Sequence, residues 1–142
     1  MFVVSDGVGT WFFESREKAC DAYQVCCIDD EYNCSIVEVI NKTPHPVTLV
    51  NGDKKVTIQP DSIPARCESE SVSVDYGIGI PCFKTEFGEV NGLPEEKEGI
   101  IYIVSSITAQ ALKGKRNDCF IVAETVRDDQ GRIVGAKCLA KI

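Results

Sequence analysis

The stretch Gly99-Ile100-Ile101-Tyr102-Ile103-Val104-Ser105-Ser106 decides the architecture, because it joins an apolar strand to the start of a helix. The unbroken apolar run over 100–104 predicts a buried strand. Ser105 and Ser106 carry hydroxyl groups suited to capping a helix N-terminus. The helix that follows is expected to run through Leu112 and to end at Gly114. The chain is therefore predicted to hold a buried strand followed by one short helix near 105–113.

Strand patterns surround this central stretch on both sides. Turn signals at Asn51-Gly52-Asp53 and at Asp128-Asp129-Gln130-Gly131 predict two hairpins. The hairpin strands are expected at Val47–Val50 and Lys55–Gln59, and at Phe120–Val126 and Arg132–Leu139. Three further short strands are expected at Ala65–Glu68, Val72–Tyr76 and Pro81–Thr85, with a bend at Gly77 and Gly79. The acidic segment Phe87–Gly99 is predicted to be a loop.

The first forty residues have a different organisation. Two β-prone segments, Phe2–Ser5 and Thr10–Phe13, precede a helix capped by Ser15. Small or apolar residues recur along that helix with the spacing of one buried face: Ala19, Cys20, Tyr23, Cys26 and Cys27. A strand over Cys34–Ile40 completes a ββαβ unit.

The segment Asn41-Lys42-Thr43-Pro44-His45-Pro46 contains two prolines and marks the junction between the two parts. The fold class predicted from these patterns is α+β. It consists of an acidic N-terminal ββαβ module over 1–40 and a mostly antiparallel β-rich domain over 41–142, with the one short helix near 105–113.

Size and composition are those of an ordinary globular protein. The chain has 142 residues, of which 44% are apolar and 26% charged, and this length suits one domain or two small ones. Its apolar runs are too short to cross a bilayer, and its first residues do not resemble a secretory signal peptide. A cytoplasmic protein is expected.

The eight cysteines and the single histidine do not form a recognisable site. No C-x-x-C pair is present, and zinc sites favour such close pairs. In a reducing compartment the thiols are expected to stay reduced, mostly as buried small hydrophobic side chains. His45, between two prolines, is interpreted as a turn residue. We expect no metal, no other cofactor and no enzymatic activity, because neither a nucleophile motif nor a metalloprotease motif occurs.

Charge is distributed unevenly along the chain. Residues 1–40 carry eight acidic and two basic residues, whereas residues 41–142 are close to neutral, with fourteen acidic and thirteen basic residues. Such a local field repels nucleic acid and attracts basic protein surfaces. The partner-binding residues predicted on this basis are Glu17, Asp21, Asp29, Asp30 and Glu31. An alternative is that these acids only keep the chain soluble.

Two other functions are compatible with the sequence. Ser105 and Ser106 at a helix start, with Lys113 and Arg116 beyond its end, could bind a small ligand such as a nucleotide signal. Capping of the helix is the simpler explanation of the two serines. A structural or assembly protein of a phage particle would also fit a β-rich chain with an exposed strand edge.

Several segments resemble a family of small phage and prophage proteins. They are Asn41-Lys42-Thr43-Pro44-His45-Pro46, Ala65-Arg66, Phe87-Gly88-Glu89-Val90-Asn91-Gly92-Leu93-Pro94, Gly99-Ile100-Ile101-Tyr102-Ile103-Val104-Ser105 and Val126-Arg127-Asp128-Asp129-Gln130-Gly131-Arg132-Ile133-Val134-Gly135. Small acidic phage proteins of this kind resemble inhibitors of host defence, such as anti-CRISPR proteins. The resemblance implies a non-enzymatic inhibitor that binds a basic nucleic-acid-handling protein, for example a Cas9-type nuclease, through its acidic surface.

Overall fold

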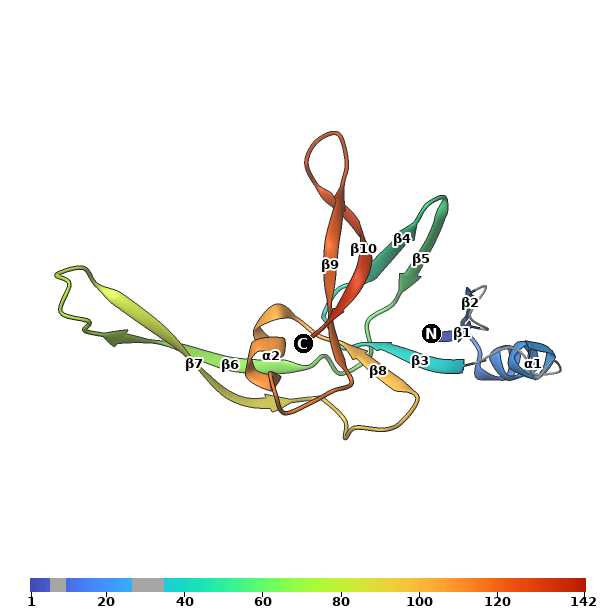
Figure 1. The fold of residues 1–142 in the computed structure, drawn as a ribbon, viewed down its shortest axis with the longest axis horizontal. Coiled ribbons are helices and arrows are strands. Elements are labelled where there is room, and N and C mark those ends of the chain that lie inside the picture. The colour runs from blue at the N-terminus through green and yellow to red at the C-terminus, as the bar shows by residue number, and fades with distance from the viewer. Residues whose placement is uncertain (6–9, 27–34) are drawn as a thin grey trace.

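A computed structural model describes residues 1–5, 10–26 and 35–142 (Figure 1). The fold class is α+β, as predicted from the sequence. The N-terminal elements are β1 (Phe2–Ser5), β2 (Thr10–Phe13), α1 (Arg16–Cys26) and β3 (Ser35–Asn41). They are followed by β4 (Val47–Asn51), β5 (Lys54–Ile58), β6 (Arg66–Val74), β7 (Cys82–Asn91), β8 (Ile100–Ile103), α2 (Ser106–Leu112), β9 (Cys119–Arg127) and β10 (Ile133–Lys141).

Eight of these strands form one sheet that extends across the predicted junction. Its strand order is β2-β1-β3-β8-β9-β10-β4-β5. The last strand of the N-terminal part, β3, pairs in parallel with β8, so that Glu38 lies opposite Ile100 and Asn41 opposite Ile103. The strands β1, β2 and β3 therefore share a sheet with five strands of the later part of the chain.

The expectation of mostly antiparallel pairing over 41–142 is confirmed, with two short parallel pairs as exceptions. The hairpins β4–β5, β6–β7 and β9–β10 are antiparallel, but β8–β9 and β10–β4 are parallel. Between β8 and β9 the chain passes through α2. This crossover lets β9 begin at the same end of the sheet as β8, which parallel neighbours require. The predicted buried strand and capped helix are thus two parts of a βαβ unit.

The hydrophobic core lies on both faces of β8. Tyr102 and Val104 pack with Leu112 of α2 and with Cys119 on one face. Ile103, which points to the opposite face, packs with Val39 and Ile58. Alternate residues of a strand point to opposite faces, so the apolar run over 100–104 is buried on both sides, which confirms the predicted buried strand.

The proline-containing junction is held by two buried polar side chains. Asn41 Nδ2 donates to the carbonyl oxygens of His45 (2.8 Å) and Ile58 (3.0 Å). Its Oδ1 accepts from the backbone N–H and the hydroxyl of Thr43. The neighbouring Lys42 side chain is also buried, and its Nζ donates to Asp61 Oδ2 at 2.5 Å. These hydrogen bonds hold the turn against the C-terminal end of β5. They also satisfy the polar groups that are buried at the junction.

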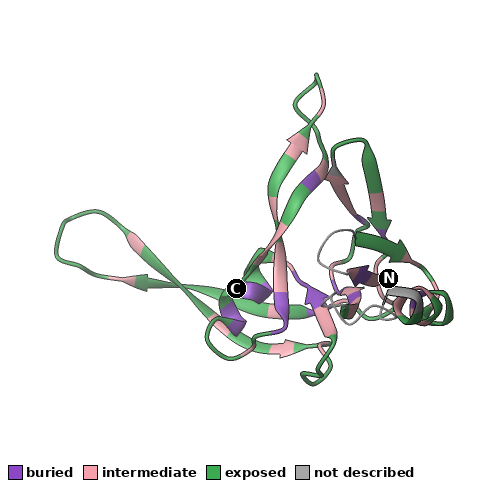
Figure 2. Cartoon of the chain, turned by 45° about the vertical axis from the view of Figure 1, so that its right-hand side comes forward, coloured by how far each residue is buried: buried purple, intermediate pink, exposed green. Residues whose placement is uncertain are grey.

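The strands β6 and β7 form a long two-stranded hairpin that projects from the body (Figure 1). The strands predicted over 65–85 are confirmed with different bounds: the first two belong to one continuous strand, β6, and the third belongs to β7. The predicted loop over 87–99 is wrong up to Asn91, where β7 ends. We call this hairpin the arm. Most of its residues are exposed on both faces (Figure 2).

Glycine permits a close backbone approach where the arm joins the body. Gly92 has a φ of +79°, and a Cβ at this position would lie 2.5 Å from the carbonyl oxygen of Pro64. An L-residue is strained at this φ and would also collide with the backbone. The bend predicted at Gly77 and Gly79 is confirmed at the other end of the arm, where both residues have positive φ.

The cysteines are less buried than expected. Among the cysteines whose side chains the structure describes, only Cys119 is buried, whereas Cys20, Cys67 and Cys82 are half-buried and Cys138 is exposed. Cys67 and Cys82 lie on the arm and Cys138 on β10.

Within the described residues, no helix is long and apolar enough to span a membrane.

Candidate functional site

The helix α1 presents acidic side chains at the end of the molecule formed by the N-terminal part. It packs against β1 with the buried Ala19 and the half-buried Cys20 and Tyr23, the face that the sequence predicted. Glu17 and Asp21 are exposed. Their carboxylates are therefore available to a partner. The other predicted partner-binding residues, Asp29, Asp30 and Glu31, lie outside the described residues.

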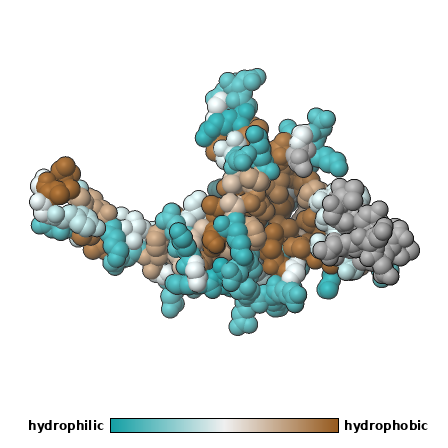
Figure 3. Space-filling model, viewed as in Figure 1, coloured by the Kyte–Doolittle hydropathy of each residue, from teal (hydrophilic) through white to brown (hydrophobic). Residues whose placement is uncertain are grey.

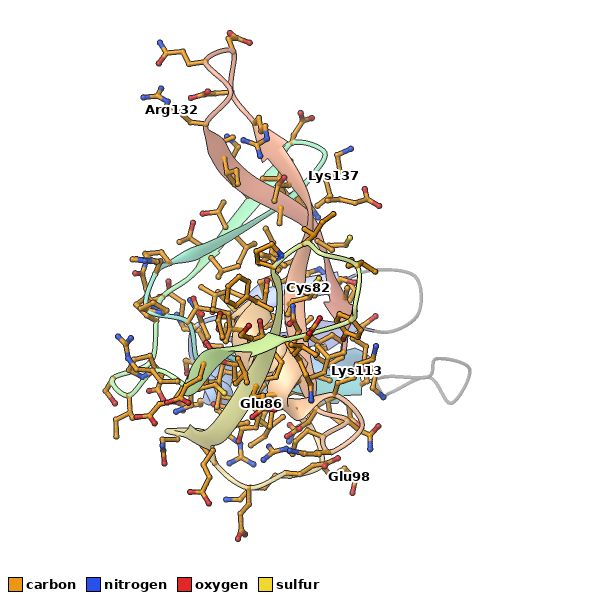
Figure 4. All side chains as sticks on the ribbon, turned by 90° about the vertical axis from the view of Figure 1, so that its left-hand side faces the viewer. Cys82, Glu86, Glu98, Lys113, Arg132 and Lys137 are labelled. Atoms are coloured by element: carbon orange, nitrogen blue, oxygen red, sulfur yellow. The ribbon has the colours of Figure 1, made fainter. Side chains whose placement is uncertain are left out.

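A second acidic segment lies beside this end of the sheet. The Glu38 N–H donates to the Gly99 carbonyl at 2.8 Å, which places the end of the 92–99 segment against β3. That segment carries the exposed Glu95, Glu96 and Glu98 (Glu98 is labelled in Figure 4). The partner-binding prediction did not include these three residues. Their acidity was visible in the sequence, but their position next to β3 depends on the parallel β3–β8 pairing.

The serines at the start of α2 cap the helix. Ser105 Oγ accepts from the Thr108 N–H at 3.3 Å and lies 2.9 Å from the Thr108 hydroxyl. Ser106 is exposed in the first turn, and Lys113 is at the opposite end as the C-cap. A helix of this length spans about 10 Å, so Lys113 does not lie beside the two serines. The capping role, the simpler explanation, is the one that this geometry supports.

Arg116 is held by internal contacts. Its Nε and Nη2 donate to the two carboxylate oxygens of Asp118 at 2.8 and 2.6 Å, and its Nη1 donates to the Pro94 carbonyl at 2.8 Å. The guanidinium also lies over the Tyr102 ring, 5.8 Å from its centroid. The hydrogen bonds from Arg116 lower the pKa of Asp118, and the same pair raises the pKa of Arg116. Arg116 thus anchors the 92–99 segment to the β8–α2–β9 unit.

A cleft of about 480 Å³ lies between the base of the arm, α2 and the proline-containing junction. Its lining comes from four segments that are far apart in the sequence. The lining residues include Pro44, Ala65, Arg66, Asn91 and Ser105. Of these, the site prediction included only Ser105. The exposed guanidinium of Arg66 can donate hydrogen bonds to a group bound there.

Reactive groups near the core are not set up for catalysis. Burial raises the pKa of the Cys119 thiol to about 12, and the adjacent Asp118 carboxylate acts in the same direction. The thiol therefore stays protonated near neutral pH and is a poor nucleophile. The His45 side chain is exposed on the junction, and its carbonyl accepts from Asn41, which agrees with a turn residue. The described part of the chain contains no group of three or more His, Cys, Asp or Glu residues placed to hold a metal ion.

Comparisons of the chain with protein-family models, with curated proteins and with solved structures found no match.

Proposed function

We propose that this protein acts by binding another protein, and that it is a phage-derived inhibitor of a bacterial defence system. The partner is a basic nucleic-acid-handling protein, with a Cas9-type nuclease as the specific candidate. The observation that carries the proposal is the exposed acidic end of the molecule. There, Glu17 and Asp21 project from α1 in a module of net charge −6.

The 92–99 segment provides a second group of acidic side chains, at the edge where it meets β3. Glu95, Glu96 and Glu98 add three carboxylates next to β3 against the single Lys97. Surface carboxylates can occupy a basic channel that otherwise binds phosphates, because association releases the same condensed counterions and is steered by the same field. In a Cas9-type nuclease, such channels and the arginines that read the short DNA motif beside the target are basic surfaces of this type.

Charge reversal tests the proposal. A Glu17→Lys/Asp21→Lys variant is compared with Asp53→Lys/Asp129→Lys, which makes the same change in net charge at exposed hairpin turns. DNA cleavage by a Cas9-type nuclease is measured over a range of inhibitor concentrations. We expect the α1 variant to need at least about tenfold more protein for half inhibition, because complementary rim charges act mainly on the association rate. The hairpin variant is expected to inhibit like the wild type.

Two further measurements complete this test. A Glu17→Gln/Asp21→Asn variant removes the charges without reversing them and is expected to show a smaller loss. Inhibition by the wild type is expected to weaken as NaCl is raised from about 50 to 500 mM, because exposed charges are screened. A wild-type chain that binds no such nuclease, or an equal loss in both reversal variants, would contradict the acidic-surface mechanism. The triple variant Asp29→Lys/Asp30→Lys/Glu31→Lys extends the test to the remaining predicted residues.

The arm favours a second candidate function, that of a phage structural or assembly protein. Long projecting hairpins with both faces exposed are suited to contacts between subunits, since a two-stranded hairpin is only marginally stable in isolation. Detection of the chain in purified phage particles by mass spectrometry would support this candidate. Its absence from particles whose host lysate contains it would exclude the candidate.

A further inference from the structure

Two apolar surfaces on this chain remain uncovered within one molecule. The first is at the end of the arm, where Tyr76, Ile78, Ile80 and Phe83 are each between 60% and 68% exposed. Figure 3 shows apolar residues gathered at this end. Together these side chains expose roughly 500 Å² of largely apolar surface, as much as the largest patch on a typical monomer, and such patches are often functional. We call this surface the arm tip.

The second surface is a groove of about 240 Å³ between the β9–β10 hairpin and β4. Its apolar lining includes Pro46, Val47, Val122, Ile133 and Val134. Val122, Ile133 and Val134 are between 40% and 58% exposed. Gly135 lets the two hairpins approach closely here, because a Cβ at this position would lie 2.8 Å from Val50 Cγ2. We call this surface the hairpin groove.

The arm of one molecule does not cover its own hairpin groove. Figures 1 and 2 show the arm and the β9–β10 hairpin leaving the body in different directions. The arm packs against α2 at its base, and its tip lies at the far end of the molecule. The apolar tip and the apolar groove can therefore meet only between two molecules.

The charges around the two surfaces are complementary. The arm, residues 66–91, carries five acidic and two basic residues, a net charge of −3. The two hairpins that form the groove, residues 47–58 and 119–141, carry four acidic and six basic residues, a net charge of +2. Two of these charges (Glu86 and Arg132 in Figure 4) are paired within the molecule, Glu86 with Lys84 at 3.6 Å and Arg132 with Asp128 at 2.8 Å, so the complementarity lies in the net charges of the two regions. Opposite charges of this kind favour the contact and steer its orientation.

We propose that the hairpin groove of one molecule receives the arm tip of a second copy of the same chain. One such contact involves roughly 700 Å² of exposed apolar side chains from both surfaces, which is less than a stable specific interface buries. Two reciprocal contacts double this area and bring it into the range of stable interfaces. The expected assembly is therefore a symmetric dimer in which each molecule places its arm tip in the hairpin groove of the other. This inference goes beyond the proposed function and does not depend on a defence target.

Sedimentation velocity of the purified full chain, kept under reducing conditions, tests the proposal. The wild type is measured from about 5 to 500 μM, a range that covers weak interfaces. A tip variant, Ile78→Asp/Ile80→Asp, and a groove variant, Val134→Asp, are expected to raise the apparent dissociation constant at least tenfold. Ile107→Asp is the matched control, since Ile107 is 50% exposed on α2, outside both surfaces. It is expected to associate like the wild type.

Mixing the two variants gives the decisive result. The tip variant retains an intact groove and the groove variant retains an intact tip, so an equimolar mixture is expected to form a 1:1 complex through one intact contact, weaker than the wild-type dimer but tighter than either variant alone. Raising NaCl from about 50 to 500 mM is expected to weaken the association. If Val134→Asp does not fold, as judged by circular dichroism, Ile133→Asp, at a more exposed residue of the groove, replaces it.

Three outcomes would overturn the proposal. The first is a wild type that stays monomeric up to the highest concentration. The second is association that persists unchanged in both the tip variant and the groove variant. Such a result would indicate pairing through the exposed sheet edges β2 or β5 instead. The third is a mixture of variants that stays monomeric. None of these measurements contains a nuclease, so their failure is independent of the proposed inhibitor function.

Discussion

Removal of the Arg116 side chain is expected to destabilise the fold strongly. Arg116→Ala eliminates the paired bonds to Asp118 and the bond to the Pro94 carbonyl. Asp118 is only 6% exposed, so its carboxylate would be left buried without its cation. Breaking a buried pair on one side costs about 3–5 kcal/mol. Because the Arg116 side chain itself keeps 16% exposure, we take the low end, about 3 kcal/mol.

The measurement is the free energy of unfolding from urea titration, with a thermal melt in parallel. A loss of about 3 kcal/mol in a chain of this length corresponds to a fall in Tm of about 10 °C. Arg116→Lys keeps the charge but not the bidentate geometry, and is expected to lower the free energy of unfolding by about half as much as Arg116→Ala. The double variant Arg116→Met/Asp118→Leu removes both charges together and should be more stable than Arg116→Ala.

Acid unfolding gives an independent check on the same pair. Arg116 lowers the pKa of Asp118 in the folded state. The stabilisation from this carboxylate is therefore complete above its ordinary pKa of about 3.9 and is lost as the pH falls through the lowered value. The wild type should lose more stability than Arg116→Ala between about pH 5 and pH 2. A cost below about 1 kcal/mol for Arg116→Ala, typical of an exposed pair, together with unchanged acid dependence, would refute the reasoning.

Three further predictions follow from single positions. Gly92→Ala should lower the free energy of unfolding, measured in urea, by about 3 kcal/mol, because the new Cβ meets the Pro64 carbonyl. Gly77→Ala has a similar φ but open space around it and should lower the same free energy by about 1 kcal/mol. Equal losses in the two variants would contradict this reasoning. Asn41→Ala should cost about 3 kcal/mol in the same assay, since it leaves several buried partners unsatisfied. In a thiol-labelling time course at pH 8, the exposed Cys138 should react first and Cys119 only on unfolding, because burial raises the pKa of Cys119 to about 12; early modification of Cys119 in the native state would argue against this.

The sequence by itself determined the features that depend on neighbouring residues. The apolar run over 100–104 was identified as a buried strand, Ser105 as a helix cap and the Asn51-Gly52-Asp53 segment as a hairpin turn. It also determined the apolar face of α1 around Ala19 and the exposure of Glu17. Local signals suffice here because backbone geometry, capping and amphipathic spacing are set within a few residues.

Only the tertiary structure decided how distant segments meet. The parallel β3–β8 pairing joins the N-terminal part to the main sheet and brings Glu95, Glu96 and Glu98 toward it. The same packing places Arg116 in an ion pair with Asp118, so its guanidinium serves the fold rather than a ligand. The strands of the arm were predicted, but their length was not, because Gly88 and the acidic residues after Phe87 favour a loop locally and pairing with β6 overrides that preference. Contacts between segments far apart in the chain follow from the packing of the whole fold, and no local pattern records them.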